Sequence, residues 1–173
     1  PRSPWLIWCN QEQMRRTPPK ANVAVISCVE PEDDFSIPEG FLEVLRLPFH
    51  DATDKDNPTF DLWEKVDEFN HRCIGEVKIQ LFTEEMAKEP LAFLKRNSDN
   101  NIMIHCRAGM SRSAAIARFA ADLLDRQPVG WATPTTQFAN SFASFIEKFR
   151  KASGCFGSAL RVSLPVIILK TYD

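Results

Sequence analysis

Apolar residues gather in four short runs that are typical of buried β-strands. The runs lie at residues 5–8, 23–28, 44–49 and 101–104. The second run is rich in β-branched residues and is followed by Pro31, as is expected where a strand ends. Because near-continuous apolar runs of this length suit strands that are covered on both faces, they predict a largely parallel sheet.

Helical periodicity occupies segments between and after these runs. Thr83 precedes Glu84 and Glu85, which predicts a helix with Thr83 as its N-cap and an acidic first turn. Pro90 is expected to kink this helix or to reset its start. Two further helices are predicted over 113–125 and 135–151. The apolar positions of the first and last helices are Met86, Ala87, Leu91, Phe93 and Leu94, and Phe138, Phe142, Phe145, Ile146 and Phe149.

Strands and helices that alternate along a chain predict an α/β fold, here a central, mostly parallel sheet flanked by helices. The 173 residues are 44% hydrophobic and 25% charged, as in one globular domain. We therefore expect a single domain over 1–173, with a tail at 153–173 whose position the pattern leaves open.

Charge and hydropathy exclude several kinds of partner. The net charge is −2, so no basic field favours nucleic acid. No apolar run approaches the roughly 18 residues of a membrane span, and the N-terminal segment has no pattern of a signal peptide. We therefore expect neither a nucleic-acid nor a membrane partner. The oligomeric state stays open.

Five cysteines are spread widely along the chain, at positions 9, 28, 73, 106 and 155. They form no C-x-x-C pair, so we expect no zinc site, and nothing else in the sequence indicates a metal or another cofactor. An odd count at wide spacing favours reduced thiols, hence a reducing compartment and a cytoplasmic location. Cys9, Cys28 and Cys73 are interpreted as small buried residues.

One cysteine has surroundings that suggest chemistry. An arginine stands six positions after Cys9, Cys106 and Cys155, so the bare spacing is weak evidence. Only Cys106 follows a strand pattern and precedes a helical one. The residues after Cys9, NQEQM, are bulky and lack glycine, and Cys155 has no clear strand before it and a proline-broken run after it. Context therefore selects Cys106 and Arg112.

A loop that leads from a strand into a helix can direct backbone N–H groups at an anion. Ala108 and Gly109 are small enough for the backbone to approach a phosphate, and Arg112 offers a planar fork for two of its oxygens. The donors that favour phosphate also favour a thiolate at Cys106. These residues predict a nucleophile aimed at a bound phosphate monoester.

The stretch HCRAGMSRS resembles the signature of the cysteine-dependent protein tyrosine and dual-specificity phosphatases, His-Cys-(x)5-Arg-Ser/Thr. A looser likeness covers about 23–149, and short bacterial and phage members are the most similar. The resemblance implies an α/β fold with the signature loop between a strand and a helix. It also implies hydrolysis of phosphate monoesters, with a phosphorylated protein or a small phosphoester as the partner.

The resemblance assigns roles by motif position. Cys106 would attack and carry the phosphoryl group, Arg112 would bind it, and Ser113 would help the thiolate leave. His105 would support the loop. The phosphate-binding residues would be Arg107, Ala108, Gly109, Met110, Ser111 and Arg112.

The family also needs an aspartic acid to protonate the leaving oxygen. The acidic segment 50–60 offers Asp51, Asp54 and Asp56. We favour Asp51 because it comes first after the predicted strand at 44–49, although Asp54 and Asp56 stay open.

Three other protein classes compete with this interpretation. A rhodanese-type sulfurtransferase has a similar loop that is one residue shorter, and a catalytically silent phosphate-binding module would not need both Cys106 and Arg112. A phosphoinositide phosphatase would carry more lysines in the loop. The sequence leaves the choice between phosphotyrosine, phosphoserine or phosphothreonine, and other phosphoesters open.

Overall fold

The computed structural model describes residues 3–51, 62–67, 72–130, 147–149 and 151–152. Five strands form one parallel sheet in the order β3-β2-β6-β1-β7, and two more form an antiparallel pair, β4-β5. The strands are β1 (Leu6–Asn10), β2 (Val23–Val29), β3 (Glu43–Pro48), β4 (Leu62–Asp67), β5 (Arg72–Lys78), β6 (Asn101–Cys106) and β7 (Pro128–Gly130); the helices are α1 (Gln11–Arg16), α2 (Glu84–Arg96) and α3 (Arg112–Leu124).

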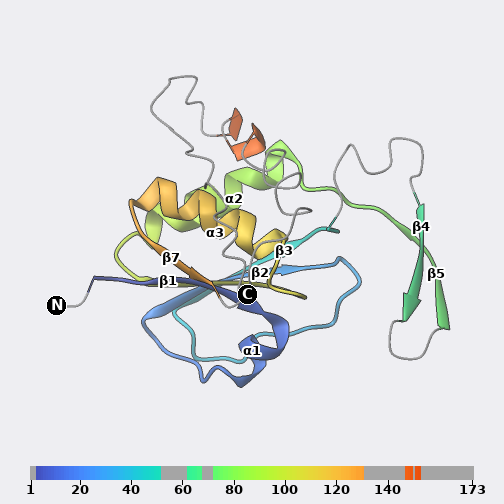
Figure 1. The fold of residues 1–173 in the computed structure, drawn as a ribbon, viewed down its shortest axis with the longest axis horizontal. Coiled ribbons are helices and arrows are strands. Elements are labelled where there is room, and N and C mark those ends of the chain that lie inside the picture. Colours follow the sequence, from blue (N-terminus) through green and yellow to red (C-terminus); the bar gives the residue numbers. More distant parts are fainter. Residues whose placement is uncertain (1–2, 52–61, 68–71, 131–146, 150, 153–173) are drawn as a thin grey trace, which may run out of the picture.

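The helices lie on both faces of the parallel sheet, α2 and α3 on one and α1 on the other (Figure 1). The main core lies between the sheet and α2 and α3, and a smaller cluster lies beneath α1. This arrangement confirms the predicted α/β fold with a central parallel sheet. In the described part of the chain, no helix is long and apolar enough to cross a membrane.

Successive side chains of the central strands point to opposite faces of the sheet, so neighbouring residues belong to different cores. Ile102, Ile104 and Cys106 belong to the main core, whereas Met103 belongs to the smaller cluster. The register pairs Ser27 of β2 with His105 of β6, so neighbouring side chains on these strands share a face. Near-continuous apolar strands are therefore the direct consequence of two covered faces.

Sequence patterns located the main elements to within two residues. The four predicted strands correspond to β1, β2, β3 and β6, and Thr83 caps α2 as expected, accepting a hydrogen bond from the Met86 N–H at 3.2 Å. Helix α2 continues through Pro90, so the expectation that this proline resets the start of the helix was wrong. Pro90 is one of the buried residues of α2, and this burial helps to offset the backbone hydrogen bond that a proline removes.

The short helix α1 was not predicted. Asn10 and Gln13 form a capping box, in which each side chain accepts a hydrogen bond from the other residue's backbone N–H. An Asn followed three residues later by Gln is the signal that could have revealed this helix.

Most of the predicted helix over 135–151 and the whole tail at 153–173 lie outside the described residues. Of the helix's apolar positions, Phe149 is described; it is buried and stacks on Phe119, with 4.0 Å between the ring centroids.

Candidate active site

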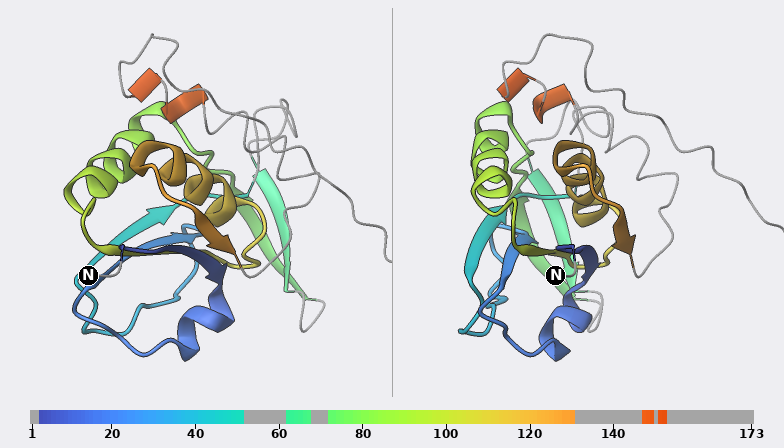
Figure 2. Two further views of the ribbon diagram at one scale, coloured as in Figure 1. Left: turned by 60° about the vertical axis from the view of Figure 1, so that its left-hand side comes forward. Right: turned by 90° about the vertical axis from the view of Figure 1, so that its left-hand side faces the viewer.

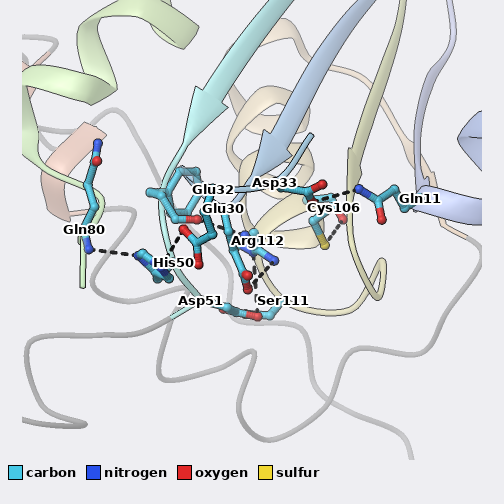
Figure 3. Close-up of polar contacts among 12 residues, drawn as sticks. Gln11, Glu30, Glu32, Asp33, His50, Asp51, Gln80, Cys106, Ser111 and Arg112 are labelled. Atoms are coloured by element: carbon cyan, nitrogen blue, oxygen red, sulfur yellow. Dashed lines mark hydrogen bonds and ion pairs between the residues drawn. The ribbon is translucent and has the colours of Figure 1, made fainter. Parts of the chain in front are cut away.

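The candidate site lies where β1, β2, β3 and β6 end on the same edge of the parallel sheet. Cys106 is the last residue of β6, and α3 begins six residues later at Arg112. In open α/β sheets, ligands bind at this carboxyl edge. The chain segments that follow these four strands supply the residues around Cys106 (Figure 3).

The Cys106 side chain lies at the base of the 107–111 loop, and only 1% of its surface is exposed. The Gly109 N–H donates to Cys106 Sγ at 3.2 Å, and Ser113 Oγ lies 3.1 Å from the same sulfur. The sulfur is thus held between the loop and the first turn of α3.

Gly109 has a structural role that the sequence did not indicate. Its φ is +73°, and a Cβ there would lie 2.8 Å from the Asn10 backbone nitrogen. The loop thus rests directly on the junction of β1 and α1, where the Gln11 N–H also donates to the Arg107 carbonyl at 3.2 Å. Only glycine combines this positive φ with this close approach.

Arg112 is buried, with 3% of its surface exposed. Its Nη1 donates to the Phe49 carbonyl at 2.9 Å, and its other nitrogens lie 4.0 Å from carboxylate oxygens of Glu30 and Asp51. Nε is buried without a hydrogen-bond partner in the described structure. The guanidinium is therefore held in place by its contacts and still has an N–H group, at Nε, that can donate a hydrogen bond to a ligand.

Asp51 lies against the same loop. Ser111 Oγ donates to Asp51 Oδ1 at 2.7 Å, while about a third of the Asp51 side chain stays exposed. The structure thus brings Cys106, Arg112, Ser113 and Asp51 to one place. The other two candidate acids, Asp54 and Asp56, lie outside the described residues.

His50, which precedes Asp51, was missed by sequence reasoning. Gln80, which follows β5, holds His50 by two hydrogen bonds: the Gln80 N–H donates to His50 Nδ1 at 2.9 Å, and the His50 N–H donates to the Gln80 carbonyl at 2.8 Å. Since Nδ1 accepts, the neutral ring carries its proton on Nε2, which lies 3.3 Å from a Glu32 carboxylate oxygen. These contacts fix the backbone next to Asp51, and no short sequence pattern predicts them.

His105 lies on the opposite face of β6 from Cys106. Its Nε2 lies 2.8 Å from Ser27 Oγ, and its ring packs on Phe35 with 5.0 Å between centroids. The pKa of His105 is lowered to about 4, chiefly by burial; the charge of Asp33 opposes this shift, and the charges of Arg112 and Arg46 add to it. His105 is therefore a neutral packing residue behind the loop at physiological pH.

A cavity of about 460 Å³ adjoins the loop at Arg107. Its charged lining is mostly acidic: Glu12, Glu30, Glu32, Asp33 and Asp34 outnumber Arg15 and Arg107. Ala108 and Met110 are exposed on the loop beside it. Within the described ranges, no group of three or more His, Cys, Asp or Glu side chains is arranged to hold a metal ion.

The three buried cysteines of the described structure should differ in reactivity. Burial, with a smaller contribution from Cys106, raises the pKa of Cys9 to about 12, and burial also raises the pKa of Cys28. Both stay neutral thiols near pH 6, so iodoacetate should label Cys106 first, and phosphate or vanadate should protect it. Peptide mapping by mass spectrometry identifies the labelled residue. Faster labelling of Cys9 or Cys28 would contradict this order.

His105 should make stability depend on pH. Its folded-state pKa of about 4 lies below the ordinary value of 6.5, so the unfolded chain binds the proton first as the pH falls. The free energy of unfolding should therefore be unaffected by His105 above pH 6.5 and should fall by about 3 kcal/mol between pH 6.5 and pH 4. Urea unfolding of wild type and His105→Asn at several pH values measures this difference. Parallel pH profiles for the two proteins would refute it.

Comparison with known proteins identifies no relative of this chain. The chain matches no family model, no curated protein and no solved structure. The residues and their geometry are therefore the basis for inferring function.

Proposed function

We propose that this protein is a cysteine-dependent phosphatase that hydrolyses phosphate monoesters of the phosphotyrosine or dual-specificity class. The observation that carries the proposal is the convergence of Cys106, the buried Arg112 and Asp51 on one strand-to-helix loop. Nucleophile, cation and acid are the three groups that this reaction needs.

The first step transfers the phosphoryl group to sulfur. The Cys106 thiolate attacks phosphorus, the S–P bond forms, and the ester P–O bond breaks with its electrons on the leaving oxygen. Asp51 donates its proton to that oxygen. Arg112 and the backbone N–H groups from Arg107 to Arg112 stabilise the charge on the equatorial oxygens.

The second step releases phosphate. Water attacks phosphorus, Asp51 accepts a proton from the water, and the S–P bond breaks. Ser113 Oγ, 3.1 Å from the sulfur, donates a hydrogen bond to the departing thiolate. This step restores the free enzyme, so no external oxidant, reductant or second substrate besides water is needed.

Charge next to the loop favours some substrates over others. The cavity at Arg107 has five carboxylates and two arginines, so it repels a polyanion such as RNA or a phosphoinositide. A phosphorylated protein or peptide brings one phosphate and no further obligatory anion. We therefore favour protein substrates.

Activity without metal is the direct test. Hydrolysis of an aryl phosphate should survive EDTA, and Cys106→Ser should abolish it because an alcohol is a far weaker nucleophile than a thiolate at neutral pH. Ser98→Ala, a change to another hydroxyl-bearing position away from the site, serves as the matched control. Activity that persists in Cys106→Ser, or that EDTA removes and a divalent ion restores, would falsify the proposal.

Asp51 should matter most for poor leaving groups, because those need the proton. Asp51→Asn should slow a phosphotyrosine peptide by about 10²-fold or more and an activated aryl phosphate by less, and the basic limb of the pH–rate profile should flatten. Glu85→Gln on α2 is the matched carboxylate control.

Steady-state kcat/KM for both substrates tests this assignment. If Asp54→Asn produces the pattern and Asp51→Asn does not, the acid lies three residues further along the chain. An equal loss for both substrates in Asp51→Asn would mean that Asp51 supports the loop without transferring a proton.

A further inference from the structure

The sheet face beneath α1 is covered much less fully than the opposite face (Figure 2). Two helices of 13 residues cover one side, whereas α1 has six residues. Parallel sheets normally bury both faces under helices. Around α1, Trp5 and Phe41 remain only partly buried against the small core cluster.

A cavity of about 670 Å³ lies on this face. Its apolar wall comes from β1, β2 and β6 and from the segment before β3, and consists of Trp5, Ile7, Cys9, Val23, Phe41 and Met103. Small-molecule sites are concave, largely apolar and of this size. All of these residues belong to described parts of the chain, away from Cys106 on the other face of the sheet.

The charged residues at this cavity are both cations. Arg16 and Lys20 line it and are exposed, and no acidic residue is among its described lining residues. Helix α1 separates it from the acidic cavity, because Glu12 and Arg15 line that cavity while Arg16 lines this one.

Arg16 can accept an anionic ligand. Its guanidinium pairs with Glu12 at 2.8 Å, and the two side chains are 78% and 58% exposed. An exposed pair of this kind contributes little to stability, so a ligand carboxylate can share or replace it. An apolar floor with cations at the edge complements a molecule with an apolar chain and one anionic head.

We propose that this cavity binds a free apolar carboxylate, with its chain against Trp5, Ile7 and Phe41 and its carboxylate between Arg16 and Lys20. A concave, largely apolar hollow fits a single chain better than a flat protein surface does, and the two cations select an acid over an alcohol. This inference does not depend on the phosphatase activity, since it uses none of the residues around Cys106.

Decanoate, kept below the concentration at which it forms micelles, is the probe, and decan-1-ol is its uncharged counterpart. Isothermal titration should show one saturable site for decanoate and about fivefold weaker binding of the alcohol. The double variant Arg16→Gln/Lys20→Gln should weaken decanoate binding to the level of decan-1-ol and leave the alcohol unchanged. Lys88→Gln/Lys95→Gln on α2 is the matched control for lost charge.

Fluorescence locates the ligand. A terminally brominated decanoate should quench tryptophan emission, and Trp5→Phe should remove most of that quenching while the heat of binding persists. The proposal is overturned if decanoate shows no saturable binding, or if acid and alcohol bind equally and ignore the double variant. Binding to anionic lipid vesicles is measured in parallel. The proposal is also overturned if the double variant weakens binding to these vesicles but not to decanoate, because that outcome assigns this face to a membrane surface.

Discussion

The buried guanidinium of Arg112 is the interaction on which the rest of the site depends. This side chain, at the start of α3, donates a hydrogen bond to the Phe49 carbonyl after β3. It also lies near the carboxylates of Asp51, two residues after Phe49, and of Glu30, directly after β2. A buried cation needs such partners, because removing one partner of a buried charge costs about 3–5 kcal/mol. The ends of β2 and β3 are thus tied to the helix that follows Cys106, and in the proposed function the same cation binds phosphate.

Two further contacts hold Asp51 beside this cation. Ser111 holds Asp51 from the loop, and the His50–Gln80 clamp fixes the backbone behind it. The loop itself is held from below, where Gly109 packs on the end of β1. Cys106, Arg112 and Asp51 therefore occupy fixed relative positions, which is the condition that the proposed catalysis by positioned charge requires.

Local patterns were sufficient for the central strands and for α2 and α3, but not for the shorter elements or for the contacts between elements. The apolar runs revealed the central strands, and the nine-residue signature selected Cys106 and Arg112, because each depends on neighbours in the chain. The Ser111–Asp51 and His50–Gln80 contacts join residues 60 and 30 positions apart, so no short pattern encodes them. Pro90 shows the converse: its local preference for ending a helix was overridden by burial in the core.

The measurement that tests the account most directly is detection of the covalent intermediate. The wild-type protein is mixed with a phosphotyrosine peptide, and the mixture is stopped with acid after a time shorter than the expected turnover, digested and mapped by mass spectrometry. We predict one added phosphoryl group on the peptide that contains Cys106, and none in the Cys106→Ser variant. Turnover with the phosphoryl group on another residue, or with no covalent species at any time point, would contradict the central claim.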